Sequence, residues 1–283
     1  MLLGTSVPLI LQACSSTRVP VLNPPGNVPP RDTVLTVPMN AKWKPESKSG
    51  RWHYIIHDSS TVSISNDTTA QARPIESTVS YTLSFTDSAD VILLTAQMDS
   101  MTVTNQKSPA RITTDTIHSR LREIISKQHR PINQRQQSFS CTTASISVAA
   151  RVQQLVIPLP MIEVDAHSKW ADTSTVVVCH GRVALTEFRT NEFKLASSVA
   201  CKQNNAVSIY RTGSSSFTGA SAEGTGHLNA GGMATESGIL CLDRSTGLLL
   251  SSTGESRVDL TVTTSRGIFP FTQNTVTSIQ LIQ

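Results

Sequence analysis

The side chains able to do chemistry in this 283-residue chain are seven histidines, five cysteines and scattered carboxylates. His53 and His57 lie four residues apart, but their segment alternates polar and apolar residues like a strand, whereas an H-E-x-x-H zinc site needs a helix. Cys179 and His180 are adjacent, so in a strand they face opposite sides and form no thiolate–imidazole pair. No serine lies in a G-x-S-x-G nucleophile elbow. We therefore expect a protein that is not an enzyme and that uses no metal, cofactor or small-molecule substrate.

Oxidation is the other chemistry open to the cysteines. Cys14 stands near the amino terminus, which leaves Cys141, Cys179, Cys201 and Cys241 for the body of the chain. An even number without a C-x-x-C motif predicts two disulfides formed in an oxidising compartment. The alternative is that some of these cysteines are small buried apolar residues of a reduced protein. The sequence does not choose between the possible pairings, but a hairpin between two apolar-alternating runs favours Cys179 with Cys201, which leaves Cys141 with Cys241.

The amino-terminal segment is apolar. Residues 1–13 contain no Lys, Arg, Asp or Glu and are too few to cross a bilayer. The segment Leu11-Gln12-Ala13-Cys14 resembles the lipobox of bacterial lipoproteins, which predicts a lipid on Cys14. The basic region that begins most signal peptides is absent, so a retained apolar tip that inserts into a membrane or binds a partner is the alternative. Both place the protein at a membrane surface, whereas a buried amino-terminal strand would not.

Prolines dominate the next segment. Residues 15–48 are predicted to form an extended arm, because closely spaced prolines prevent a helix and favour polyproline conformation. Such an arm can hold the body away from its anchor or lie along a partner. The prolines expected to contact a partner are Pro20, Pro24, Pro25, Pro29 and Pro30.

Residues 49–283 are predicted to form a single β-rich domain. Polar and apolar residues alternate over 52–64, 80–86 and 90–103, which indicates three antiparallel strands. Ile117, Leu121, Ile124 and Ile125 recur at helical spacing and predict a helix over 113–129. A second helix over 142–153 is a weaker prediction, because a strand fits that segment nearly as well.

Strand signals resume after residue 160 and continue to the end of the chain. We expect strands near residues 173–186, 193–200, 206–212, 216–228, 237–243, 247–253, 256–264 and 275–282, with a hairpin over 242–248. Six glycines are expected to mark turns or bends. These are Gly213, Gly219, Gly224, Gly226, Gly231 and Gly232.

Composition fits this outline. Hydrophobic residues make up 38% of the chain and charged residues only 16%, which is typical of half-buried strands with a hydroxyl-rich outer face. The net charge of +4 is not gathered in a Lys/Arg cluster, so no nucleic-acid binding is expected. The predicted fold is mainly β: a large antiparallel curled sheet, or an open β-barrel or sandwich, with one or two helices, preceded by the extended proline-rich arm.

A family resemblance rests on the segment Leu159-Pro160 through Trp170-Ala171-Asp172-Thr173, followed by alternating strands and the hairpin from Asp243 to Leu249. This pattern resembles a group of uncharacterised bacterial envelope lipoproteins. The resemblance implies an antiparallel sheet curled around a helix over residues 50–283, similar to the LolA/LolB lipoprotein carriers, and no catalytic residue. Residues 165–167, Asp-Ala-His, replace the family's usual glycine, so the turn there is expected to differ.

Two functions follow as hypotheses, both for a periplasmic protein tethered to a bacterial membrane. The first is a structural or accessory subunit that docks on the periplasmic side of a membrane protein complex, contacting its subunits through the arm and the β domain; reaction-centre light-harvesting complexes are the specific expectation. The alternative is a carrier of lipids or lipoproteins, whose curled sheet encloses an apolar cavity. A continuous apolar groove of roughly several hundred Å³ would favour the carrier, whereas a filled core would contradict it.

Overall fold

The structure of the chain is a computed structural model. It describes residues 43–64, 73–105, 108–112, 120–132, 148–165, 167–180, 183–196, 201, 205–221 and 228–282. All of these residues belong to one compact unit, Val34–Gln283. Cys14 and the prolines of the predicted arm lie outside the described residues. No helix formed by the described residues is long and apolar enough to cross a membrane.

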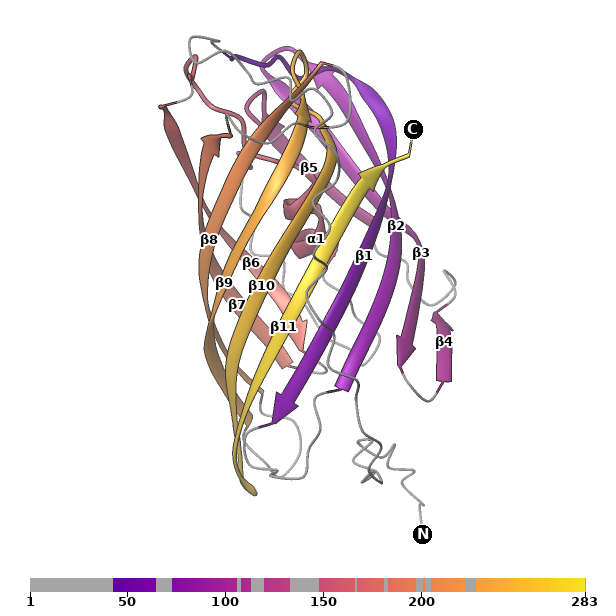
Figure 1. Cartoon of the computed structure of the whole chain (residues 1–283), viewed down its shortest axis with the longest axis vertical. Helices are drawn as coiled ribbons and strands as arrows, with labels where there is room; N and C mark the ends of the chain where they lie inside the picture. Colours follow the sequence, from indigo (N-terminus) through magenta and orange to yellow (C-terminus); the bar gives the residue numbers. More distant parts are fainter. Residues whose placement is uncertain are drawn as a thin grey trace, which may run out of the picture. The chain divides into compact units, whose positions relative to one another are not determined.

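The described part of the body is mainly β, as predicted, and forms one antiparallel sheet of eleven strands (Figure 1). The order across the sheet is β4-β3-β2-β1-β11-β10-β9-β8-β7-β6, and β5 also pairs with β3. The strands are β1 Gly50–Ile64, β2 Arg73–Ser88, β3 Val91–Asn105, β4 Ser108–Ile112, β5 Arg120–Ser126, β6 Lys169–His180, β7 Val183–Leu195, β8 Ala206–Ser221, β9 Leu228–Asp243, β10 Leu249–Thr264 and β11 Gly267–Leu281.

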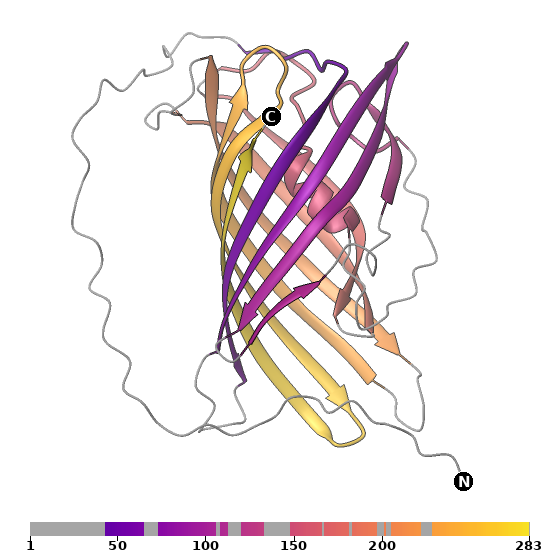
Figure 2. The same ribbon diagram turned by 90° about the vertical axis from the view of Figure 1, so that its right-hand side faces the viewer.

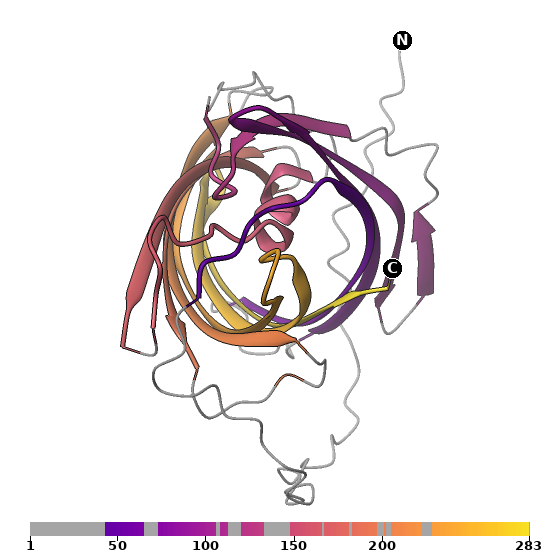
Figure 3. The same cartoon turned by 90° about the horizontal axis from the view of Figure 1, so that it is seen from above.

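The sheet curls around a short helix. Helix α1, Val148–Leu155, lies within the curve when the body is seen from above (Figure 3). The side view places α1 in the half of the sheet away from the tight β10–β11 turn (Figure 2). The helix contacts β6, β3 and β5, the strands at the two sides of the opening. Helix α1 therefore fills the space between the two edges of the sheet in the half of the body where it lies.

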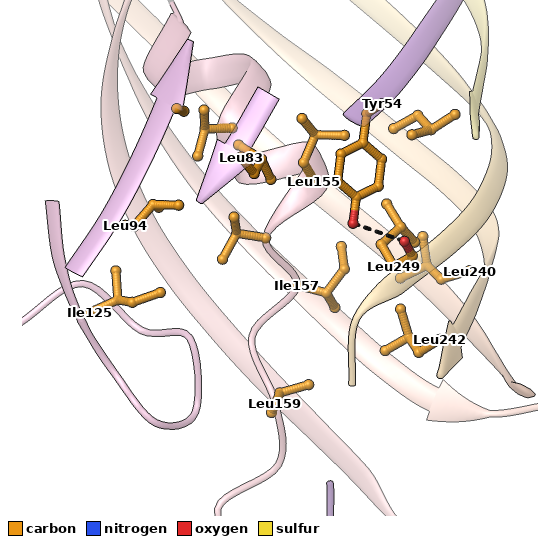
Figure 4. Packing of buried hydrophobic residues seen from close by; sticks show 14 of the residues in the cluster. Tyr54, Leu83, Leu94, Ile125, Leu155, Ile157, Leu159, Leu240, Leu242 and Leu249 are labelled. Atoms are coloured by element: carbon orange, nitrogen blue, oxygen red, sulfur yellow. Dashed lines mark hydrogen bonds between the residues drawn. The ribbon is translucent and has the colours of Figure 1, made fainter. Parts of the chain in front are cut away.

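The hydrophobic core gathers around α1. Strand β1 places Tyr54 and Ile56 on its inward face with no exposed surface, because alternate side chains of a strand point to the same side. Val152 and Leu155 of α1 pack in the same cluster. The Tyr54 hydroxyl donates a hydrogen bond of 2.9 Å to the Leu249 carbonyl, so its only polar atom is satisfied inside the core (Figure 4). This end of the curled sheet is filled by side chains.

Trp43 belongs to this core, although the sequence placed it in the arm. Its side chain is 3% exposed, and its backbone pairs with Val164. The indole Nε1 donates a hydrogen bond of 3.0 Å to the Arg244 carbonyl, and the ring lies 5.9 Å from that of Trp170. The folded body therefore begins at or before residue 43, and a lone tryptophan among prolines and lysines gave no periodic pattern that would have predicted this.

The helix predicted over 113–129 is wrong where the structure describes it. Residues 120–126 form β5, paired with β3, and its burial alternates: Leu121 and Ile125 are buried while Arg122 and Ile124 are exposed. Three of the four apolar residues at helical spacing are separated by even numbers of residues, so the sequence pattern also fits one face of a strand. The adjacent isoleucines favour the strand because β-branched side chains prefer it. The weaker second prediction is confirmed over 148–153, where α1 lies.

Several predicted strand breaks are wrong as well. Strand β8 continues through Gly213 and Gly219, and β9 continues through Gly231 and Gly232, because each strand is hydrogen-bonded to neighbours on both sides. Conversely, the strand predicted over 173–186 is two strands, β6 and β7, joined through residues 181–182. Pairing in the sheet outweighs the weak strand preference of glycine. The hairpin over 242–248 is confirmed.

The favoured disulfide pairing is also wrong. Cys201 bonds Cys241, with their Cα atoms 5.7 Å apart, so it cannot bond Cys179. The reason is topological: Ser208 of β8 faces Cys241 of β9, and the segment before β8 folds back so that the Cys201 sulfur lies 3.0 Å from the Ser208 hydroxyl. In the backbone register of β6 and β7, Cys179 lies opposite Ala184. Cys141 lies outside the described residues.

Candidate functional site

The inward face of the sheet is divided into three bands along the strands. On β10 the inward residues run from Ser252 beside the core, through Gly254 and Ser256, to Val258, Leu260 and Val262. The neighbouring strands continue this order in register, since Leu260 lies opposite both Phe271 and Gly232. The first band is the filled core around α1, the middle band is polar, and the third band is apolar again.

Charged residues of the middle band form what we call the charged belt. It consists of Asp58 on β1, Arg151 on α1, Arg130 after β5, Asp172 on β6, Glu187 and Arg189 on β7, Arg211 on β8 and Glu236 on β9. Each arginine has a carboxylate partner, so the belt carries balanced charge. The pairs are Arg130–Asp172 at 2.7 Å, Arg151–Asp58 at 2.6 Å, Arg189–Glu187 at 2.8 Å and Arg211–Glu236 at 3.3 Å.

Burial shifts the pKa of several charged groups in the belt and near it. Burial lowers the pKa of the Arg211 guanidinium, although the Glu236 carboxylate opposes this shift. Burial raises the pKa of Asp172, and Arg130 partly offsets it. Glu123, on β5, has its pKa raised by burial. Charges in this band persist because an opposite charge accompanies them, since an unpaired buried charge is costly.

A polar cluster within the belt has unused hydrogen-bonding capacity. Asn191, Gly213 and Glu236 lie side by side in register on β7, β8 and β9, and Arg211 shares their face two residues along β8. Among the described residues, Asn191 Oδ1, Glu236 Oε1 and Arg211 Nε are buried without a hydrogen-bond partner. Buried polar atoms are normally paired. We call Asn191, Arg211, Gly213 and Glu236 the polar cluster.

Gly213 makes the polar cluster possible. A Cβ atom at this position would lie 2.5 Å from Asn191 Oδ1 and 2.7 Å from Glu236 Oε1, so any larger residue would push one of them away. The absence of a side chain lets two acceptor oxygens from neighbouring strands converge on one place.

A small pocket adjoins this cluster at the opening of the sheet. It holds about 40 Å³ and is lined on one side by Val152, Ile157 and Phe193, and on the other by Asn191 and Arg211. Such a volume admits a few water molecules or one small polar group. Side-chain hydrogen bonds hold the opening together here: Arg130 donates to the Ala171 carbonyl at 3.1 Å, and Ser174 donates to Gln153 at 3.4 Å.

The third band forms what we call the apolar inner wall. Its side chains pack into one cluster, drawn from strands β6 to β11 alone, with no member from α1 or from a described connecting segment. Most members keep part of their surface exposed. The wall consists of Val178, Leu185, Phe217, Leu228, Ala230, Val258, Leu260, Val262 and Phe271.

The outer face is polar on β10, whereas β7, β9 and β11 also expose Phe188, Met233, Ile268 and Val276 there. On β10, Arg257 and Asp259 form an exposed ion pair at 2.9 Å, and Thr261 and Thr263 continue the outer row. Ordinary sheets of this kind bury their apolar face and expose their polar one. Here the apolar face of the third band is only partly covered by the described part of the body.

The predicted site residues lie elsewhere. Cys201 and Cys241 join a loop to the sheet, Cys179 lies on β6, and Cys14, Cys141 and the arm prolines fall outside the described residues. The described residues contain no group of three or more potential metal ligands from His, Cys, Asp and Glu. The charged belt and the apolar inner wall were missed, although a charged residue among apolar alternate positions, as at Arg211 between Ile209 and Phe217, was a visible signal.

Comparisons with known proteins do not show a family for this chain. No family model matches the chain, and no curated protein matches it. Among solved structures, Pseudomonas aeruginosa OccK8 (OprE) aligns over 84% of this chain and 99% of its own, with 8% identity and a TM-score of 0.16. A TM-score this low carries no structural or functional argument.

Proposed function

We propose that this chain is an exported, non-enzymatic carrier whose curled sheet takes up the hydrocarbon chain of a lipid or of a lipidated protein. The observation that carries the proposal is the apolar inner wall, whose members are mostly part-exposed on the concave face of the sheet. Partly exposed apolar surface on a concave face is typical of a binding site.

Removal of the apolar inner wall from water would favour binding of a hydrocarbon chain. Complete burial of a Val, Leu or Phe side chain is worth about 1.5–3 kcal/mol relative to leaving it exposed. The wall includes Phe217, Val258, Val262 and Phe271, all partly exposed. A hydrocarbon chain placed along them removes this surface from water and demands no hydrogen bond. It therefore suits a wall without polar side chains.

Two further features support an envelope location for such a carrier. The Cys201–Cys241 disulfide is typical of proteins that fold in an oxidising compartment. The lipobox-like segment ending at Cys14 would hold the carrier close to a membrane that supplies or receives its cargo. The pocket beside α1 is too small for an acyl chain, so the proposal concerns the third band and not the core.

Binding of a dansyl-labelled undecanol, a probe whose head group is uncharged, tests the proposal. The probe should bind the purified protein with saturable fluorescence enhancement, and Val262→Asp should weaken binding about tenfold or more, because a carboxylate placed on the wall is costly to bury. Thr263→Asp is the matched control: it adds the same charge to the adjacent residue on the outer face and should bind as the unmodified protein does.

The outcomes separate the possibilities. Circular dichroism shows whether both variants keep the sheet. If the unmodified protein does not bind the probe, or if both aspartate variants weaken binding equally, the carrier proposal is wrong.

The accessory-subunit hypothesis stays a prediction. The proline-rich arm that motivates it lies outside the described residues. Affinity purification of the full chain from membranes in mild detergent tests it, and recovery of the chain without stoichiometric partners would contradict it.

A further inference from the structure

We infer that the polar cluster recognises an uncharged head group bearing two neighbouring hydroxyls, as in a glycerol or sugar ether, with the hydrocarbon chain of the same ligand on the apolar inner wall. This inference rests on the proposed carrier function and specifies which lipids the carrier prefers. Its basis is the cluster on β7, β8 and β9 whose polar atoms lack partners among the described residues.

The cluster is a built site and not a surface feature. Asn191 is 8% exposed, and its Oδ1 accepts no hydrogen bond within the described body. Glu236 uses Oε2 for the ion pair with Arg211 at 3.3 Å, which leaves Oε1 free. Arg211 in turn retains Nε as an unused donor. Two acceptors therefore converge beside Gly213, and one donor belongs to the arginine two residues away on the same strand.

The chemistry of the ligand follows from this set. Two neighbouring hydroxyls donate one hydrogen bond to Asn191 Oδ1 and one to Glu236 Oε1, and either hydroxyl oxygen accepts from Arg211 Nε. A carboxylate or phosphate head offers no donor and would face the Glu236 carboxylate. A quaternary ammonium head neither donates nor accepts hydrogen bonds and would face Arg211. Because each belt arginine has its own carboxylate, no net charge attracts an ion.

The cluster is continuous with the apolar inner wall. On β8 the inward residues after Gly213 are Ser215 and Phe217, and on β9 the inward residues before Glu236 are Ala234 and Gly232. Small side chains thus separate the polar cluster from the first wall residues. A single amphiphile can place its head at the cluster and its chain along the wall.

Amphiphiles with the same chain and different heads test the inference on the unmodified protein. Dodecylglycerol, dodecyloxypropanol, dodecanoate and dodecyltrimethylammonium, each below its micellar concentration, compete with the dansyl probe. Dodecylglycerol should compete about tenfold better than dodecyloxypropanol, which has one hydroxyl, since one lost hydrogen bond in a buried site has about this effect. The charged heads should be weaker still.

Two variants test whether Asn191 is responsible for the head-group preference. Asn191→Leu keeps a similar volume but removes the acceptor, and it should abolish the preference for dodecylglycerol over dodecyloxypropanol. Asn274→Leu, the same change on the outer face of β11, is the control and should keep the preference. If Asn191→Leu fails to fold, the four-ligand series on the unmodified protein still decides the matter.

The results distinguish this inference from the proposed function. Equal competition by all four amphiphiles would overturn the head-group site, with water as the partner of the cluster, while leaving the carrier intact. Tighter binding of either charged head would also overturn it. Binding of none of them would overturn the carrier proposal itself.

Discussion

At the scale of single residues, the interior of this sheet combines apolar packing with polar groups that have specific partners. Asp58 is 5% exposed and accepts hydrogen bonds from Thr277 at 2.6 Å and Ser77 at 3.4 Å besides its ion pair with Arg151. Such networks contribute to stability only when every member is satisfied. Tyr81 Oη, Arg130 Nε and the polar cluster depart from this rule among the described residues. The cluster is assigned a ligand because three such atoms lie on adjacent strands there.

His129 predicts a pH dependence of stability. The ring is 4% exposed, donates Nδ1–H to the Ile157 carbonyl at 3.1 Å and accepts from the Ser47 hydroxyl at Nε2, 2.9 Å away. Burial lowers its pKa from 6.5 to about 4. Between these values the unfolded chain binds a proton that the folded chain does not, so the free energy of unfolding should fall by roughly 3 kcal/mol as the pH drops through this window.

Urea denaturation of the unmodified protein and of His129→Gln between pH 7 and pH 4 measures this contribution. The variant should be less stable at pH 7 and should lose less stability on acidification, because the remaining slope comes from carboxylates common to both proteins. Parallel slopes for the two proteins would contradict the assignment.

At the scale of elements, α1 is short and depends on its surroundings. Eight residues are too few to form a stable helix alone. Val148, Val152 and Leu155 are buried against the sheet, so the helix is held by packing. The same dependence explains why helix periodicity misled over 120–126: local spacing of apolar residues fits both structures, and pairing with β3 selects the strand.

Leu155→Ala should test the role of α1 as the filling of the core. Leu155 is 2% exposed, and deletion of a buried leucine side chain typically costs about 2–5 kcal/mol. Ile162→Ala is the matched control, because Ile162 is 75% exposed and should change stability little. Denaturant unfolding of both variants gives the comparison, and equal effects would mean that α1 does not fill the core.

At the scale of the whole body, a covalent link joins two segments that lie far apart in the sequence. The Cys201–Cys241 disulfide spans 40 residues and includes all of β8 and most of β9. A crosslink over a loop of this length restricts the unfolded chain and stabilises by roughly 3–4 kcal/mol.

The Cys201→Ser, Cys241→Ser double variant should therefore unfold at a clearly lower denaturant concentration than the oxidised protein. Peptide mapping without reduction should recover Cys201 linked to Cys241. Recovery of a Cys179–Cys201 peptide would restore the pairing that the sequence favoured and would contradict this prediction.

The fold class and the position of most strands were predictable from local pattern, because alternation over segments such as 52–64 is a property of neighbouring residues. The paired cysteines and the hydroxyl-rich outer face were equally visible. Three features could not be predicted from local pattern: whether residues 120–126 form a helix or a strand, the continuity of β8 through Gly213, and the identity of the disulfide partners. Each of them depends on which strands lie side by side.

The sequence alone therefore determined that this is a mainly β protein, since composition and period-two patterning require no knowledge of contacts. Only the tertiary structure decided what lies inside the curve. Asn191, Arg211 and Glu236 are on three strands, and their meeting beside Gly213 follows from the register of β7, β8 and β9. The apolar inner wall likewise exists because six strands align their apolar positions at one end, a consequence of sheet pairing that no single segment encodes.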